Sequence, residues 1–272
     1  MKLGVMQGRL SPIINKKIQS FPWNNWVNEI STLKVLKFNY LEWTLDYPQL
    51  RKNPLFNLKN FEKINNVNID SVTCDFFMQK PFFNYKNNKT ILSDFQFFLN
   101  KIKKTNISII VIPLVDNSSI KNKKIEKKVI TFFLSFQKWL AKNNKKIAFE
   151  IDYKPKNVKK FIDNFPKKTF GINYDLGNSS ALNYNINDEF KLYHERIINI
   201  HIKDRLYKGI SVPLGLGNAK IEKFASLYKK YKLKSKLILQ TARSKNNTHI
   251  LEILKNKIYL SNIFINFGLH LK

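Results

Sequence analysis

Four polar residues, each placed directly after a short apolar stretch, give the strongest chemical signal in the sequence. They are Glu150, Asp175, His201 and Gln240, and the stretches before them are rich in Ile, Leu and Phe. Two carboxylates, an imidazole and an amide oxygen are suitable ligands for a divalent cation such as Mn, Mg, Co or Zn. Such residues can also be ordinary polar groups at the rim of a fold. Four of them in equivalent positions favour the metal site.

Other polar residues occupy the same kind of position and are candidates for contact with a substrate. They are Gln7, Arg9, Glu42, Asp75, Arg205 and Arg243. Only five of the 48 basic residues are arginine, and three of those five are in this group. Because lysine serves almost everywhere else, these arginines suggest a need for a planar, bidentate fork that holds a phosphate or a carboxylate.

The elements that must position these residues are read from an alternation along the chain. Short apolar runs rich in β-branched and aromatic residues alternate with amphipathic, lysine-rich segments of helical length, such as Ile120–Asn143 and Ala219–Tyr231. The expected strands are Leu3–Gln7, Tyr40–Thr44, Ser71–Phe76, Ser108–Leu114, Ile147–Ile151, Phe170–Asp175, Ile197–Ile202 and Lys236–Thr241. Eight strand–helix units predict a single α/β domain over residues 1–272, a (β/α)₈ TIM barrel. The tail, Ile258–Lys272, is expected to pack as a final helix or a cap.

In such a barrel the side chains inside the strands form a packed core, and reactive groups gather where the strands end. Adjacent strands lie about 4.8 Å apart. Ligands from the fifth to the eighth strand can therefore converge on one ion. No Gly-x-Gly-x-x-Gly turn follows the first strand, which argues against a dinucleotide-binding sheet.

The formal net charge of +29 would suit a nucleic-acid surface, because basic surfaces attract phosphate backbones. The lysines, however, are scattered along the whole chain among many Asn, Ile and Phe residues, as A/T-rich codons would supply. We therefore interpret most of the charge as solvated surface and expect no nucleic-acid partner, with acidic partners as a lesser alternative.

The lone Cys74 cannot form an internal disulfide, which indicates a reducing compartment. The sequence shows no signal peptide after Met1 and no run of about 18 apolar residues. We expect a cytoplasmic protein without a membrane segment, which could form a homo-oligomer.

Several motifs resemble those of the xylose isomerase-like TIM-barrel superfamily, and more narrowly its sugar phosphate isomerase/epimerase group. The N-terminal ones are Met6-Gln7-Gly8-Arg9-Leu10-Ser11-Pro12, Phe21-Pro22-Trp23 and Tyr40-Leu41-Glu42-Trp43. The later ones are Asn173-Tyr174-Asp175-Leu176-Gly177-Asn178, His201-Ile202-Lys203-Asp204-Arg205 and Leu214-Gly215-Leu216-Gly217-Asn218. The similarity spans nearly the whole chain, and none of the motifs identifies a substrate.

The resemblance implies a metal-dependent enzyme that acts on a sugar or a sugar phosphate. In the superfamily a Glu, an Asp, a His and a second Glu commonly bind the divalent metal, and Glu150, Asp175 and His201 match the first three. Gln240 stands at the fourth place, where it can coordinate a metal but cannot take a proton. A symmetrical epimerisation by two glutamate bases is therefore in doubt.

The mechanism that we expect is isomerisation or epimerisation through an ene-diolate. Glu150 would remove the proton next to the substrate carbonyl, and Lys203, Asp75 or a water molecule would return a proton in place of the missing glutamate. Two alternatives stay open. The chain could be a degenerate barrel that binds a sugar derivative without turnover, or a metal-dependent nuclease like the apurinic-site endonucleases, whose sites are richer in histidine.

Overall fold

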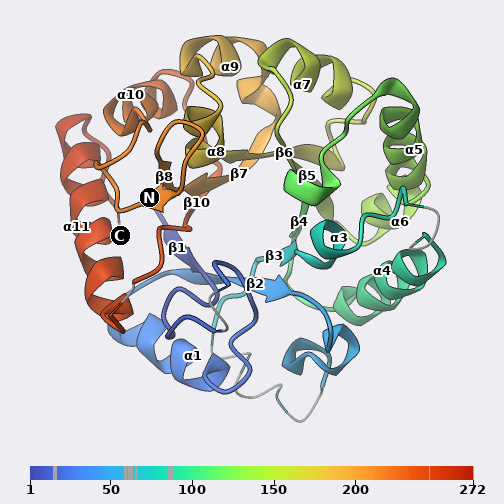
Figure 1. Ribbon diagram of the computed structural model, residues 1–272, viewed down its shortest axis with the longest axis horizontal. Helices are drawn as coiled ribbons and strands as arrows, with labels where there is room; N and C mark the ends of the chain where they lie inside the picture. The colour runs from blue at the N-terminus through green and yellow to red at the C-terminus, as the bar shows by residue number, and fades with distance from the viewer. Residues whose placement is uncertain are drawn as a thin grey trace.

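The computed structural model describes residues 1–14, 17–57, 60, 64, 67–84, 88–244 and 246–271. Within these residues, eight parallel strands close into a barrel in the order β1-β10-β7-β6-β5-β4-β3-β2, and helices form an outer ring around it (Figure 1). The barrel strands are β1 (Leu3–Met6), β2 (Tyr40–Leu45), β3 (Ser71–Cys74), β4 (Ile109–Leu114), β5 (Lys146–Ile151), β6 (Phe170–Asp175), β7 (Ile197–Ile202) and β10 (Lys236–Leu239). The predicted (β/α)₈ barrel is confirmed.

The helices lie between the strands along the chain. The α-helices are α1 (Trp26–Val35), α3 (Phe76–Gln79), α4 (Asn88–Ile102), α5 (Lys123–Leu134), α6 (Gln137–Lys142), α7 (Pro155–Ile162), α8 (Leu176–Ala181), α9 (Ile186–Tyr193), α10 (Ile221–Lys230) and α11 (His249–Asn266). Short 3-10 turns are η1 (Leu50–Lys52), η2 (Pro54–Phe56), η4 (Asp116–Ser118) and η5 (His194–Arg196). Among the described helices, none has the length and apolar character needed to cross a membrane.

Two helical boundaries differ from the sequence expectation. The expected helix over Ile120–Asn143 is divided into α5 and α6, and the Ser135 hydroxyl between them bonds back to the carbonyl oxygen of Phe132 at 2.6 Å. A serine hydroxyl that bonds to a nearby backbone carbonyl competes with helical hydrogen bonding. The final helix begins at His249, well before Ile258, after a turn in which Ser244 Oγ accepts the amide hydrogens of Asn246 and Thr248.

The barrel interior is apolar in the half nearer the amino ends of the strands. Side chains along a strand alternate between the two faces, so Tyr40 and Glu42 of β2 point the same way. The Tyr40 ring packs with Met6 and Ile238 inside the barrel. Gly4 makes room for this ring, because a Cβ atom there would lie 2.2 Å from it. Any larger residue at position 4 would displace the tyrosine.

Outside the barrel, a layer of aromatic rings joins the strands to the helices. Phe133 of α5 contacts Phe149 of β5 with the ring centres 5.1 Å apart, and Phe95 of α4 contacts Phe133 at 6.1 Å. All three side chains are fully buried. Burial of a Phe side chain contributes roughly 1.5–3 kcal/mol, so this layer fixes the strands whose far ends carry the polar residues.

Candidate metal and substrate site

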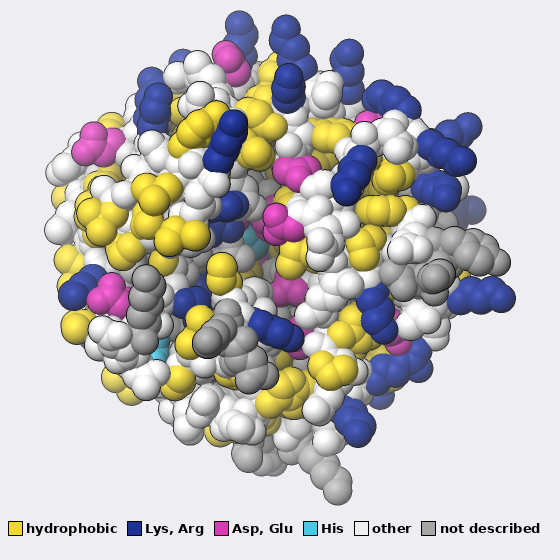
Figure 2. All heavy atoms as spheres, in the orientation of Figure 1, with side chains coloured by type: hydrophobic (Ala, Val, Ile, Leu, Met, Phe, Trp, Pro, Cys, Tyr) yellow, Lys and Arg dark blue, Asp and Glu magenta, His cyan; other side chains and the backbone are white. Residues whose placement is uncertain are grey.

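Glu150, Asp175 and His201 meet at the carboxyl ends of β5, β6 and β7. His201 Nδ1 lies 3.2 Å from Glu150 Oε2 and 3.9 Å from Asp175 Oδ2. One ligand atom of each residue lies within 4.8 Å of the other two, and all three residues are buried. Three of the four residues that the sequence pattern singled out thus converge on one point. Figure 2 shows a hollow at the centre of this face, where acidic and basic side chains surround a histidine.

Asp175 is oriented by the start of α8. It is the last residue of β6 and also the N-cap of α8, where its Oδ1 accepts the amide hydrogen of Asn178 at 2.7 Å. Its other oxygen, Oδ2, is turned toward His201 and lies 2.6 Å from Lys203 Nζ. The cap uses only one oxygen, so a cation bound to the second would have to share it with the Lys203 ammonium or displace that group.

Glu150 is held by two asparagine side chains. Asn173 Nδ2 donates to Oε2 at 2.9 Å, and Asn178 Nδ2 donates to Oε1 at 2.7 Å. Burial alone would raise the pKa of Glu150, but hydrogen bonding to His201 and the charges of His201 and Lys203 outweigh it, so the pKa is lowered. The group is therefore an ionised carboxylate at neutral pH.

His201 is fixed by a carboxylate behind it. Its Nε2 lies 2.6 Å from Glu42 Oε1, which leaves Nδ1 facing Glu150 and Asp175. Burial lowers the pKa of His201, but the charges of Glu42 and Glu150 outweigh burial and raise it to about 10. The surroundings therefore favour positive charge at this point. A carboxylate that holds the far nitrogen is the usual support of a metal-binding histidine.

Glu42 lies inside the barrel with no exposed surface. Besides His201, its carboxylate accepts hydrogen bonds from Ser71 Oγ and Thr73 Oγ1 of β3, each at 2.7 Å, and from Asn199 Nδ2 of β7 at 2.8 Å. Burial opposes its ionisation, but His201 and these donors lower its pKa. The sequence pattern proposed Glu42 for substrate contact, and the structure places it behind His201.

Gln240 comes directly after β10 and faces a lysine. Its Oε1 accepts a hydrogen bond from Lys203 Nζ at 3.1 Å, and its Nε2 lies 3.1 Å from the sulfur of Met6. The Lys203 ammonium therefore lies between the Gln240 amide oxygen and the Asp175 carboxylate. A cation ligated by Gln240 would have to share this oxygen with Lys203 or displace the ammonium.

Glu150, Asp175 and His201 together fit a divalent cation, and we call them the three firm ligands. Two carboxylate oxygens and an imidazole nitrogen form a donor set used for zinc and for harder divalent ions. The buried Asp175 Oδ2 receives no aligned hydrogen bond from any described residue, but it is paired with the Lys203 ammonium at 2.6 Å, which a bound cation would have to displace or accommodate. Gln240 is uncharged, and the Lys203 ammonium lies beside it. The negative charge available to the ion is therefore lower than it would be with a glutamate at position 240.

Gln7 and Asp75 lie at the same end of the barrel, directly after β1 and β3. Gln7 Oε1 accepts the amide hydrogen of Thr44 at 3.0 Å. Gln7 Nε2 and Asp75 Oδ2 are buried and have no hydrogen-bond partner in the described part of the chain. Burial first, and the charges of Asp46 and Glu150 next, raise the pKa of Asp75 well above its usual range. The surroundings therefore favour the protonated form of the Asp75 carboxyl group.

Two of the three arginines are anchored to loops at the mouth. Arg9 Nε donates to the carbonyl oxygen of Thr241 at 2.8 Å, and Arg9 Nη1 donates to Gln19 Oε1 at 2.8 Å. Burial, and then Arg243, lower the pKa of Arg9 to about 9. Arg243 Nη2 donates to the carbonyl oxygen of Ser11 at 3.0 Å. Both arginines therefore hold the loop after β1 in place.

Arg205 belongs to a small hairpin over the mouth. Strands β8 (Asp204–Arg205) and β9 (Ser211–Val212) pair antiparallel. Arg205 Nη1 donates to Asn178 Oδ1 at 2.8 Å, and the Asn178 amide in turn holds Glu150. Asp204 accepts the amide hydrogens of Gly215, Gly217 and Ala219 at 2.9 to 3.0 Å. A Cβ at position 217 would lie 2.1 Å from Asp204 Oδ1, which explains the glycine there.

Sequence reasoning missed the asparagines that organise the site. Asn173 and Asn199 each lie two residues before Asp175 and His201 on the same strand. Residues two apart share a strand face, so the alternation could have placed both on the inner side. Their side chains bond to each other, with Asn199 Nδ2 donating to Asn173 Oδ1 at 2.9 Å.

Glu29 of α1 was also missed, and it clamps the loop after β1. Its carboxylate accepts hydrogen bonds from the Gly8 amide at 3.0 Å, the Leu10 amide at 3.1 Å and the Ser11 hydroxyl at 2.7 Å. The side chain has no exposed surface. Burial raises the pKa of Glu29 to about 7 despite these donors, with the nearby Arg243 also opposing the rise.

This shift makes a prediction about stability and pH. Between about pH 4.5 and 7 the folded chain keeps a proton on Glu29 that the unfolded chain releases, so the contribution of Glu29 to stability falls by about 3 kcal/mol as the pH rises. Urea unfolding of wild type and the Glu29→Gln variant at several pH values measures it. The free energy of unfolding of wild type minus that of the variant should fall by about 3 kcal/mol from pH 4.5 to pH 7. Parallel curves would contradict the prediction.

Comparison with solved structures gives matches over nearly the whole chain. The IOLI protein with a bound zinc atom is 15% identical, with a TM-score of 0.74 and coverage of 98% of this chain and 99% of that one. A xylose isomerase-like TIM-barrel protein from Mycobacterium smegmatis in complex with magnesium is 12% identical, with a TM-score of 0.70 and coverage of 97% and 96%. A sugar phosphate isomerase/epimerase from Parabacteroides distasonis ATCC 8503 is 14% identical, with a TM-score of 0.69 and coverage of 95% and 92%.

No protein-family model and no curated protein sequence matches the chain. At identities of 12 to 15%, the structural matches establish the fold and leave the activity to be argued from the site. The chain has the fold of the xylose isomerase-like TIM barrels, as the sequence motifs indicated.

Proposed function

We propose that this chain is a metal-dependent isomerase or epimerase of a sugar or sugar phosphate, with Glu150 as the base. The observation that carries the proposal is the convergence of Glu150, Asp175 and His201, whose ligand atoms lie within 4.8 Å of one another in a buried site. A divalent cation bound there would polarise the substrate carbonyl and the neighbouring hydroxyl. Solved proteins of this fold include zinc-bound and magnesium-bound examples and sugar phosphate isomerase/epimerases.

The residues of the chain have the following proposed roles. Glu150, oriented by hydrogen bonds from Asn173 and Asn178, removes the proton next to the carbonyl, and this gives an ene-diolate. Lys203 returns a proton to the ene-diolate, at the neighbouring carbon for isomerisation or at the opposite face of the same carbon for epimerisation. Asp75 is the alternative donor, because burial and the charges of Asp46 and Glu150 favour the protonated form of its carboxyl group.

Substrate orientation is assigned to the remaining mouth residues. Arg205 reaches the site through Asn178, while Arg9 and Arg243 shape the loop after β1. Gln7 presents an unpartnered amide nitrogen within the described structure. Glu42 acts through His201 and is proposed as a positioning residue.

Binding without turnover is the second candidate function. The observation in its favour is the Lys203 ammonium, which lies 2.6 Å from Asp175 Oδ2 and 3.1 Å from Gln240 Oε1 and so already supplies a positive charge where a fully acidic site would hold its metal. A nuclease activity gains no support, because the metal cluster of the described residues contains one histidine, His201, and His194 lines the cavity at the opposite end of the barrel.

Solvent exchange separates these candidates. The purified protein is incubated in heavy water with Mn, Mg, Co or Zn and a panel of ketoses and their phosphates, and the proton next to the carbonyl is followed by NMR. Exchange with at least one member is expected. Saturable binding of a sugar without exchange under any metal would replace the isomerase with the binding barrel.

A further inference from the structure

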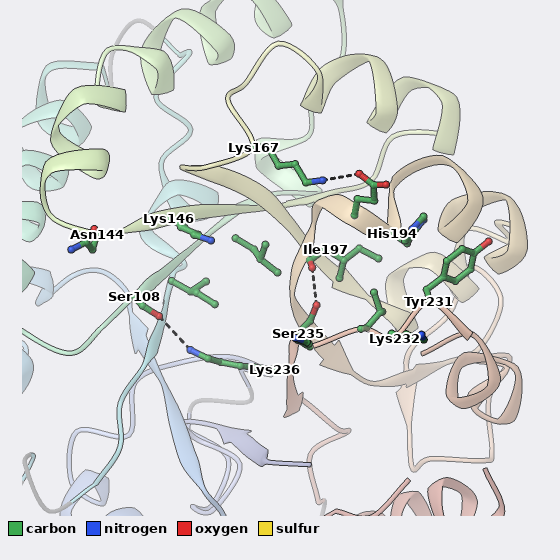
Figure 3. Close-up of a pocket in the computed structure, with 15 residues that line it drawn as sticks. Ser108, Asn144, Lys146, Lys167, His194, Ile197, Tyr231, Lys232, Ser235 and Lys236 are labelled. Atoms are coloured by element: carbon green, nitrogen blue, oxygen red, sulfur yellow. Dashed lines mark hydrogen bonds and ion pairs between the residues drawn. The ribbon is translucent and has the colours of Figure 1, made fainter. Parts of the chain in front are cut away.

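A second cavity lies at the opposite end of the barrel, beneath the amino ends of the strands. It measures about 530 Å³, a volume that suits a small-molecule ligand. Its walls include Ile109, Lys146, Ile197 and Lys236, which begin β4, β5, β7 and β10. Figure 3 shows side chains from all four strands and from the loop after α10 lining this cavity. None of the residues proposed for catalysis lines it.

The cavity is strongly basic. Lysines 146, 167, 232, 234 and 236 line it. Lys167 pairs with Glu195 at 2.6 Å, and Lys236 pairs with Asp70. No ion pair between described residues involves Lys146, Lys232 or Lys234, which leaves three uncompensated ammonium groups around one concavity. A concave wall with charges of one sign concentrates the field and attracts counter-ions.

The remaining walls are partly apolar and aromatic. The ring of His194 stacks on Tyr231 with centres 4.1 Å apart and planes inclined by 31°. Both residues line the cavity, together with Leu233. Burial lowers the pKa of Lys236 at the cavity floor to about 8, so an anion beside it would favour its charged form. The pocket thus combines several cations with a surface for a planar or apolar group.

We propose that this cavity is a binding site for a small organic anion that carries two or more phosphate groups. Three ammonium groups are needed to balance such a charge, and the His194–Tyr231 wall can receive the organic part of the ligand. Isolated surface lysines are ordinarily solvated, so the argument rests on their arrangement around one cavity. The proposal is independent of the function assigned to the opposite end.

Calorimetric titration of the metal-free protein with tripolyphosphate and with ATP tests the site. We expect saturable binding of both probes, and binding weaker by about tenfold or more in a Lys146→Ala, Lys232→Ala, Lys234→Ala variant, because three charge contacts are removed together. ATP should bind more tightly than tripolyphosphate, and His194→Ala should reduce that advantage. Thermal unfolding checks that each variant is folded.

Two controls locate the binding. The variant Lys121→Ala, Lys128→Ala, Lys156→Ala loses the same charge at exposed lysines that do not line the cavity, and it should bind both probes within twofold of wild type. Arg205→Ala alters the mouth of the barrel and should also leave binding unchanged. Equal weakening in the lysine control would show that only the overall charge matters. Weakening by Arg205→Ala would show that the probes bind at the mouth of the barrel. Either result, or the absence of saturable binding, would refute the proposal.

Discussion

The Glu150→Gln variant is expected to lose exchange of the substrate proton by a factor of about 10³, within the range that general-base catalysis contributes. Glutamine keeps the shape of the side chain and can still accept from one asparagine, so the barrel should fold normally. It cannot accept the proton. The rate is measured in heavy water by NMR at saturating metal, so that weaker metal binding does not imitate a loss of the base.

A surface substitution of the same kind provides the control. Glu222→Gln changes an exposed carboxylate on α10 and should exchange at the wild-type rate. Lys203→Met should keep much of the exchange but lose net conversion of substrate to product, since the proton is removed but not returned on the productive path. If Asp75→Asn shows that pattern and Lys203→Met does not, the donor is Asp75. Unchanged exchange in Glu150→Gln would remove Glu150 as the base.

The second large effect that we expect is a loss of bound metal when two of the proposed ligands are removed. Purified wild-type protein, loaded with Mn, Mg, Co or Zn and then dialysed, is expected to retain about one ion per chain, and the Glu150→Ala, His201→Ala variant to retain none. Two of the three firm ligands are lost in this variant, and a single carboxylate beside Lys203 binds a divalent ion only weakly. Elemental analysis of both proteins measures the ratio. Equal metal content would rule out this metal site.

The Glu42→Gln variant refines the same measurement. Glu42 is not one of the proposed metal ligands, but it fixes the ring of His201, whose Nε2 lies 2.6 Å from Glu42 Oε1. Loss of such a support lowers metal affinity by about 10- to 100-fold. A variant with wild-type affinity would show that His201 is held well enough by Asn173 and the neighbouring carboxylates alone.

The lysines of this basic protein fall into two groups, those that are solvated separately and those that line one cavity. Across much of the molecule, lysine side chains project outward around the edge of the face seen in Figure 2. At the amino end of the barrel several of them face one cavity. The difference lies in geometry, since separate lysines are screened by water and salt while lysines around one concavity act on the same ligand.

The sequence by itself determined the barrel and the meeting of three polar side chains at its mouth. The reason is periodicity: parallel strands end at one edge of a barrel, so Glu150, Asp175 and His201, each at the end of an apolar strand, had to come together. The resemblance to xylose isomerase-like barrels pointed the same way. The boundaries were less accurate where a local hydrogen bond decided them, as with Ser135 between α5 and α6.

Only the tertiary structure decided which groups support that cluster. Glu42 lies far from His201 in sequence, and closure of the barrel brings its carboxylate across the interior to the histidine ring. Pairing of β10 with β7 brings Gln240 toward Lys203, and the packing of α1 places Glu29 under the loop after β1. Strand spacing predicts which residues reach the rim of a barrel. Side-chain packing across the interior and between loops decides which of them touch, and no short-range pattern in the chain encodes those contacts.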